Sequence, residues 1–344
     1  MVRWSAATGI RFDEPEPDED DFEDDPAPRH RRGGRKLGFV LVTLGLVFLA
    51  YAIMRVFAAE TDPFTVAAVT ITPYVVAAGV LLGLVTLLLG RRVVGVSVLA
   101  MALALSALLL PRYLSDSQPE ADGPRLRIMA ANLFNGRADP GALVDLVRTQ
   151  HVDLLVLPEL TPAAMAALDE EGLGDLLPNR VLDARVGGDG TGVLAKYPLR
   201  KIVLMPESTL GQLSTVVDVP GPDEIEVAAI HIQPPTSAAS VPVWRNELGA
   251  LPDPDVDERT RILAGDFNAT LDHAAFRELL DRGYVDAAEE AGEGLSPTWS
   301  DWPLGPPITI DHFLADARSA IVSYAVFDLP GSDHNAILSE MVLP

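Results

Sequence analysis

Polar residues that could take part in chemistry recur where predicted β-strands end. Each follows an apolar run in a short phrase, and the set comprises Asn132 (AANLFN), Glu159 (LPEL), His231 (AIHIQPP), Asp266 and Asn268 (LAGDFN), Asp311 (TIDHF), and Asp333 and His334 (GSDH). The carboxylates of Glu159 and Asp333 are hard oxygen ligands, which suit a magnesium-like ion. His334, with Asp311 available to orient its imidazole, has the surroundings that a water-activating base requires. These residue types predict a metal-assisted site that activates water.

Each phrase taken singly also has a structural interpretation. Asn132 could cap a turn, His231 could be a core histidine, and Asp266 could close a turn before Phe267. In GDFN, however, Asp266 and Asn268 stand two residues apart on a predicted tight turn, where both can face one ligand. The chain contains no cysteine, which excludes disulfides, thiolate ligands and cysteine nucleophiles, and its histidines lack zinc-ligand spacing.

The predicted secondary structure would bring these residues to one place. Apolar patterns predict strands at residues 125–131, 153–157, 192–195, 215–219, 225–231, 261–264, 308–314 and 336–342. Helical patterns occur at residues 140–149, 162–170, 243–251 and 273–282. Because strands outnumber helices and several strands end in a polar residue, the pattern favours a layered α/β enzyme with its site at one rim of the sheets.

The chain before residue 125 has a different character. Residues 11–28 combine like charge with proline, so residues 1–36 are predicted to form an acidic, disordered tail that ends in a basic cluster. Within residues 37–110, three uncharged apolar runs are each long enough for a helix to cross ~30 Å of hydrocarbon. We therefore expect three transmembrane helices, which are placed at about 37–57, 66–90 and 93–110. Residues 111–124 are a predicted linker.

Charged residues and a proline in and around these apolar runs predict how the spans begin, end and are oriented. Arg55 is expected to extend to the interface at the end of the first span, and Pro73 to kink the second span or mark its beginning. Basic residues gather before the first span, and Arg91 and Arg92 lie between the second and third. If all three spans cross, both clusters fall on one side, which the positive-inside rule assigns to the cytoplasm. The domain that follows would then lie outside the cytoplasm of a multi-pass membrane protein.

The charge of the chain bears on its partners. The formal net charge is -23, and residues 120–344 hold 36 acidic and 15 basic residues, a balance of -21. Because the sequence also lacks a basic, aromatic stretch, this negative balance disfavours nucleic acid as a partner. Acidic residues that bind a metal ion would be neutralised by it and would not repel a phosphate. The apolar runs, in turn, account for a mean hydropathy of +0.21 and predict contact with a lipid bilayer.

Together, and in this order, the phrases resemble the endonuclease/exonuclease/phosphatase superfamily over residues 125–344, with GDFN and the late SDH as the most specific part. The resemblance implies an α+β fold, a four-layer sandwich of two stacked β-sheets flanked by helices, and divalent-metal-dependent hydrolysis of phosphoester bonds. It implies that Asn132 binds the metal–phosphate group, that Glu159 binds the metal, and that Asp333 is a second metal or water ligand. Mg²⁺ is the expected ion, with Mn²⁺ or Ca²⁺ as alternatives.

The same resemblance gives roles to the other residues. It implies that His231 contacts the scissile phosphate, that Asp266 aligns or activates the attacking water, and that Asn268 binds a phosphate oxygen. Asp311 would orient His334, the catalytic histidine.

Three further polar residues in or near these phrases are not expected to be catalytic. His312 faces away from Asp311 on a predicted strand and is expected to be structural. Arg245 fits a helix that packs on the sheet. Tyr197 lies in the sequence Lys196-Tyr197-Pro198, which departs from the basic residue and proline that usually follow this strand in the family.

The leading functional hypothesis is a membrane-anchored phosphodiesterase or phosphatase that acts outside the cytoplasm on a phospholipid headgroup or a small phosphodiester. A membrane-attached endonuclease or exonuclease is the alternative, and a non-catalytic binding module on the same fold is a second alternative. If the spans serve only as an anchor, a fragment of residues 120–344 should be soluble and active.

Overall fold

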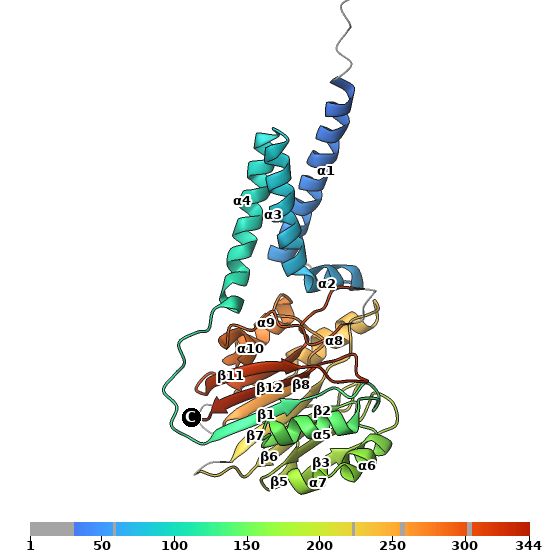
Figure 1. The fold of residues 1–344 in the computed structure, drawn as a ribbon, viewed down its shortest axis with the longest axis vertical. Helices are drawn as coiled ribbons and strands as arrows, with labels where there is room; N and C mark the ends of the chain where they lie inside the picture. The colour runs from blue at the N-terminus through green and yellow to red at the C-terminus, as the bar shows by residue number, and fades with distance from the viewer. Residues whose placement is uncertain (1–30, 58–59, 222–223, 255–258, 301–304) are drawn as a thin grey trace, which may run out of the picture.

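A bundle of apolar helices stands on a layered α/β domain (Figure 1). The computed structural model describes residues 31–57, 60–221, 224–254, 259–300 and 305–344. The acidic tail predicted at residues 11–28 lies outside the described residues.

Two six-stranded sheets form the centre of the α/β domain. The first contains β1 (Arg125–Ala130), β2 (Leu154–Pro158), β3 (Asn179–Asp183), β4 (Thr191–Ala195), β11 (Ala320–Phe327) and β12 (Ala336–Val342). The second contains β5 (Leu199–Ile202), β6 (Leu213–Val217), β7 (Ile225–His231), β8 (Arg261–Asp266), β9 (Tyr284–Asp286) and β10 (Asp311–Asp316). Their strand orders are β11-β12-β1-β2-β4-β3 and β5-β6-β7-β8-β10-β9.

The sheets stack because alternate strand residues are apolar on the inner faces. Ile128 and Ala130 of β1 point into a buried core that they share with Val227 and Ala229 of β7. Met129, between them, points the other way into the layer of helices on the first sheet. The inner faces therefore hold the two sheets together, and the outer faces bind helices.

Helices cover both outer faces. On the first sheet lie α5 (Pro140–Thr149), α6 (Pro162–Glu170) and α7 (Leu173–Leu176), which pack into one apolar cluster with β1 and β2. On the second lie α8 (Ser240–Gly249) and α9 (Ala274–Leu280), whose buried Trp244 and Phe276 pack against β7 and β8. The short α10 (Ala287–Glu290) follows β9. The domain is thus a four-layer sandwich, which confirms the predicted architecture.

Strand direction sets the position of the candidate site. β1 and β2 are parallel and are linked by α5, and β7 and β8 are parallel and are linked by α8. The carboxyl ends of these four strands therefore lie at one rim. β10 is antiparallel to β8 and β12 is antiparallel to β1, so both begin at that rim. In this register Asp266 lies beside His231 on one side and Asp311 on the other.

The N-terminal helical part consists of α1 (Arg31–Val56), α2 (Pro63–Thr70), α3 (Thr72–Leu88), α4 (Arg92–Leu109) and the 3₁₀ turn η1 (Leu110–Tyr113). Two segments, Arg35–Val56 and Arg92–Tyr113, are long and apolar enough to cross a membrane. Many of their large apolar side chains, such as Phe39 (73% exposed), lack protein neighbours and suit contact with lipid.

The second predicted span, residues 66–90, is not one continuous helix. The chain bends by 69° between α2 and α3, so a third crossing requires both helices together. Pro73, at the start of α3, has no N–H to donate and would crowd the carbonyl four residues earlier, which stops the helix from running through Ile71. Asp62 begins α2 separately, because its side chain accepts hydrogen bonds from the N–H groups of Phe64 and Thr65. The expected break at Pro73 is thus confirmed, and of the three predicted spans two qualify as single helices while the third depends on α2 and α3 together.

A buried ion cluster joins the helices to the α/β domain. Arg55 at the end of α1 donates to Asp272 at 2.9 and 3.2 Å, and Arg112 in η1 donates to the same carboxylate at 2.8 and 3.1 Å. All three side chains are at most 6% exposed. Arg55 therefore does not extend to the interface as predicted, because it has a buried partner in the domain.

Candidate active site

A cleft of about 720 Å³ opens at the rim where the strands end. Its lining includes five of the residues predicted from the sequence: Glu159, His231, Asp266, Asn268 and His334. They come from the ends of β2, β7 and β8 and from the segment before β12. The fold therefore brings together side chains that are up to 175 residues apart, and the cleft is the candidate active site.

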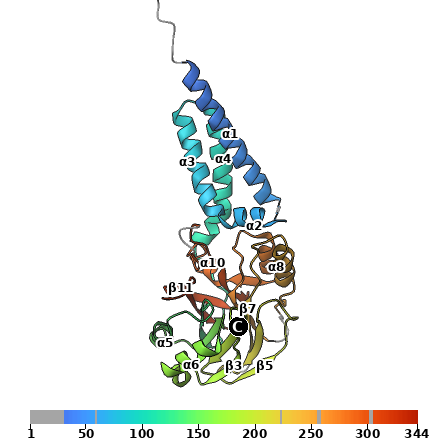
Figure 2. The same ribbon diagram turned by 90° about the vertical axis from the view of Figure 1, so that its right-hand side faces the viewer.

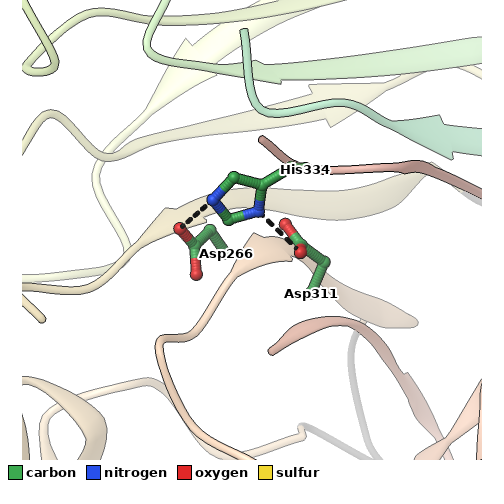
Figure 3. A group of neighbouring side chains, drawn as sticks. All are labelled: Asp266, Asp311 and His334. Carbon is green, nitrogen blue, oxygen red and sulfur yellow. Dashed lines mark hydrogen bonds and ion pairs between the residues drawn. The ribbon is translucent and has the colours of Figure 1, made fainter. Parts of the chain in front are cut away.

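His334 and Asp311 form a hydrogen-bonded dyad (Figure 3). The Nδ1 atom of His334 lies 2.9 Å from Oδ2 of Asp311, and Thr298 donates its hydroxyl to the same oxygen at 2.7 Å. Burial lowers the pKa of His334, but the charges of Asp311 and Asp266 outweigh it and raise that pKa to about 10. His334 is thus a protonated imidazole held in a fixed orientation, able to donate from Nε2.

Asp266 faces the dyad with one oxygen and closes a turn with the other. Its Oδ1 accepts from the backbone N–H of Asn268 at 2.8 Å, and its Oδ2 lies 3.8 Å from Nε2 of His334. Asn132 donates its side-chain amide to Oδ2 at 3.2 Å. Burial raises the pKa of Asp266. Asp266 therefore closes the turn with Oδ1, and its Oδ2 faces His334 and Asn132.

Asn132 and Glu159 form the neighbouring part of the rim. The Nδ2 of Asn132 donates to Oε1 of Glu159 at 3.1 Å, while its Oδ1 accepts from Phe134 N at 2.9 Å and caps the turn. Asn135 N donates to Oε2 of Glu159 at 2.6 Å. Glu159 has a positive φ of 59°, which is uncommon for a residue with a Cβ. Such strain clusters at functional sites, where surrounding contacts hold it in place.

His231 lies between these two groups and is 3% exposed. Its Nε2 is 3.7 Å from Oε1 of Glu159 and 3.9 Å from Oδ2 of Asp266, and its Nδ1 is buried without a hydrogen-bond partner. Burial and the charge of His334 lower the pKa of His231 to about 4. The ring is therefore neutral near pH 7 and can donate one hydrogen bond into the cleft.

Two further predicted residues, Asn268 and Asp333, make contacts outside this group of residues. Asn268 lines the cleft with a positive φ of 47°, and its Nδ2 donates to Ile232 O at 2.9 Å. Asp333 is not among the residues that line the cleft; its Oδ2 accepts from Nε1 of Trp299 at 3.2 Å, and its Oδ1 is buried without a partner.

The donor set fits a divalent cation. Glu159, Asp266 and Asp311 place three carboxylates at the rim, and the described residues that line the cleft include no lysine or arginine to balance them. Carboxylate and amide oxygens are the ligands that Mg²⁺ prefers. Asp266, Asp311 and His334 each offer one atom within 4.8 Å of the others, which makes them one possible ligand group. Since the pKa of His334 keeps it protonated, Glu159 with Asn132 is the better donor pair.

Sequence reasoning missed Thr298, which holds Asp311, and Trp299, which contacts Asp333 and lines the cleft. Neither belongs to a phrase with a charged or imidazole group, so no sequence signal marked them. His312 is fully buried between Asp286 (2.8 Å) and Ala269 O (2.9 Å), which is the environment of a structural histidine. Arg245 donates to Glu60 O at 3.4 Å, away from the dyad.

Residues 129–334 match the sequence model described as the Endonuclease/Exonuclease/phosphatase family. A search of curated proteins found no match. Among solved structures, an endonuclease/exonuclease/phosphatase from Beutenbergia cavernae is 21% identical, with a TM-score of 0.52 and coverage of 64% of this chain and 72% of that one. Humanized D. rerio TDP2 (16%, TM-score 0.48, coverage 63% and 98%) and sphingomyelinase C from Streptomyces griseocarneus (16%, TM-score 0.47, coverage 63% and 99%) are also similar.

Proposed function

Since the chain belongs to the endonuclease/exonuclease/phosphatase family, we propose that it is a membrane-anchored, divalent-metal-dependent phosphodiesterase or phosphatase. The observation that supports this most strongly is the convergence of the Asp311–His334 dyad, Asp266, His231 and Glu159 at one rim. A binding module would need no such set of carboxylates and imidazoles in hydrogen-bonding order.

The residues divide the chemistry among them. Asp311 holds Nδ1–H of His334, so Nε2–H faces the cleft and donates to a phosphate oxygen. Asp266 orients or deprotonates the attacking water, and its raised pKa suits proton transfer near neutral pH. Neutral His231 and the amide of Asn268 donate to other phosphate oxygens.

Glu159 and Asn132 would hold the metal, with Asp333 as a second metal or water ligand. When bound, Mg²⁺, or Mn²⁺ or Ca²⁺ in its place, polarises the phosphate and offsets the charge that grows on its oxygens. The protein supplies the donors in a buried, preorganised arrangement.

The proposed substrate is a phospholipid headgroup or a small phosphodiester. A nuclease would need basic side chains to track a phosphate backbone, and the described lining of the cleft contains none. Two apolar helices suited to a membrane also lie next to the domain.

The orientation is proposed from the basic clusters that flank the apolar helices, with the N-terminus in the cytoplasm and the domain outside. An alkaline phosphatase reporter fused at the C-terminus should be active. A reporter active only in the cytoplasm would contradict this orientation.

The activity is tested on the full chain in detergent with bis-p-nitrophenyl phosphate, p-nitrophenyl phosphate, phospholipids, DNA and RNA, each with Mg²⁺, Mn²⁺ or Ca²⁺. We expect metal-dependent hydrolysis of a phosphodiester or a monoester, and weaker or no cleavage of DNA and RNA. The absence of hydrolysis with every substrate and ion would contradict the proposal, and preferential cleavage of nucleic acid would assign the nuclease alternative.

A further inference from the structure

The short helix α2 forms one wall of the catalytic cleft. Pro63, Val66, Ala67 and Thr70 line it, and their spacing of i, i+3, i+4 and i+7 places them on one face of the helix. Figures 1 and 2 show α2 lying across the end of the α/β domain at the base of the helix bundle. The membrane-facing part of the chain therefore contributes directly to the surface that a substrate would meet.

Buried contacts fix α2 in this position. His273 accepts from Thr270 N at its Nδ1, so its Nε2 carries the proton and donates to Val66 O at 3.2 Å. Glu60, just before α2, accepts from Ala274 N at the start of α9 at 3.0 Å. Polar contacts therefore hold the wall in place, and α2 itself contributes no charged side chain to the cleft.

A second apolar stretch lines the same cleft. It comprises Pro306, Ile308 and Ile310, which precede Asp311 in the chain, and Tyr74 of α3 donates its hydroxyl to Pro307 O at 2.6 Å, which ties this segment to the helix bundle. Neither α2 nor the described residues 305–310 contribute a charged side chain. A free, hydrated headgroup gains little from such walls, whereas a hydrocarbon chain is stabilised when it is buried against them.

A second cavity of about 290 Å³ extends the lining toward the helix bundle. Pro73, Tyr74 and Ala77 of α3 line it, and it shares Thr70 and Ile308 with the catalytic cleft. The charged residues in its lining, Arg112 and Asp272, are paired with each other. The shared lining therefore connects the catalytic cleft, past α2, to a helix of the candidate membrane bundle.

We propose that α2 and residues 305–310 form a binding site for the hydrocarbon part of a membrane-resident phosphoester. The inference rests on the proposed phosphoesterase function and narrows its substrate to a lipid, with the phosphate at His334 and the first chain segment between Ala67 and Ile308. The membrane helices then select the substrate in addition to anchoring the domain.

The test compares two diesters that release the same product, methyl p-nitrophenyl phosphate and hexadecyl p-nitrophenyl phosphate, with the full chain in one detergent. The variant Ala67→Phe fills the cleft face of α2. Ala78→Phe adds the same ring at an exposed position of α3 that lines neither cavity, and it controls for partitioning into micelles.

We expect the ratio of kcat/KM for the hexadecyl ester over the methyl ester to fall at least ~10-fold in Ala67→Phe, since loss of two buried methylene groups already gives that factor. The ratio should hold in Ala78→Phe. Equal ratios in all three proteins would overturn the hydrocarbon site, while active hydrolysis of both esters would leave the proposed function intact.

A second readout does not need turnover. A hexadecyl phosphodiester with a diazirine near the phosphate end of its chain is photo-cross-linked to the full chain, and the labelled peptides are identified by mass spectrometry. Labels at residues 63–71 and 305–310 that disappear in Ala67→Phe support the site, and labels confined to α1 and α4 overturn it. An inactive protein that still gives the first pattern contradicts the proposed function alone.

Discussion

Arg55, at the end of α1, donates two hydrogen bonds to Asp272, which lies 217 residues later in the α/β domain. Arg112, at the end of α4, binds the same carboxylate. One buried aspartate therefore ties the C-terminal end of α1 and the turn η1 after α4 to the domain. The next residue, His273, donates to Val66 O of α2, so α1, α2 and η1 all contact one short segment of the domain.

Removal of Asp272 should destabilise the full chain. Asp272→Ala leaves two arginines buried without their partner, and loss of one member of a buried ion group costs ~3–5 kcal/mol. Urea unfolding in detergent, followed by tryptophan fluorescence, measures the change. Asp253→Ala is the matched control, because its ion pair with Arg282 is largely exposed and should contribute less than ~1 kcal/mol. Equal effects of the two substitutions would argue against the cluster.

The same cluster predicts a dependence of stability on acidity. Burial raises the pKa of Asp272, but Arg112 and Arg55 outweigh it, so the folded pKa lies below the ordinary 3.8. A lowered folded pKa adds stability that is fully present above the unfolded pKa and is lost as pH falls through the folded pKa. The wild-type chain should therefore lose this contribution only below about pH 3.8, and Asp272→Asn should lack that acid loss. Unfolding curves measured between pH 2.5 and 6 test the difference. An equal loss of unfolding free energy below pH 3.8 in the wild-type chain and in Asp272→Asn would contradict it.

The inner strands of both sheets were predictable from sequence, and the edge strands were not. β1, β2, β7, β8 and β12 are mostly or fully buried, so their apolar runs stand out, and the predicted bounds of β7 and β12 agree with the structure. β3, β5, β9 and β11 are the four edges. The half-exposed sequences NRVLD and LRKI of β3 and β5 give no such run, because an edge strand packs fewer neighbours.

Residues of the candidate site were predictable because they lie at or next to the ends of buried strands. The ion cluster was not, because Arg55, Arg112 and Asp272 are distant in sequence and a pairing at that range leaves no mark on local periodicity. The bend between α2 and α3 had a local signal in Pro73, whereas the contact of α2 with the cleft had none. The idea of an independent catalytic fragment of residues 120–344 therefore overlooked a wall of the cleft.

The His334–Asp311 dyad predicts that substitutions of its two residues have non-additive effects on turnover. His334→Ala should lower turnover by ~10²–10⁴-fold, the usual worth of a general acid or base. Asp311→Asn should also lower it, because Asp311 acts by holding the His334 ring. The double variant should be no worse than His334→Ala alone. Multiplicative losses would contradict a shared role, and His151→Ala, an exposed histidine, serves as the control.

Metal removal tests the role of Glu159. Chelation of divalent ions should abolish hydrolysis and added Mg²⁺ should restore it. Glu159→Gln should require at least ~10-fold more Mg²⁺ for half-maximal activity, since it replaces a charged ligand by a neutral one. Glu170→Gln, at an exposed position of α6, should titrate like the wild-type chain. Superimposable titrations for Glu159→Gln and the wild-type chain would place the metal elsewhere.

The central claim is that one rim of the sandwich hydrolyses phosphoesters with Glu159, Asp266 and His334. Its most direct test is the turnover of bis-p-nitrophenyl phosphate by the full chain with Mg²⁺, measured for folded Glu159→Gln, Asp266→Asn and His334→Ala. Each substitution should reduce turnover by at least ~100-fold, which is ~2.7 kcal/mol of barrier. Near-wild-type turnover in all three variants would contradict the account.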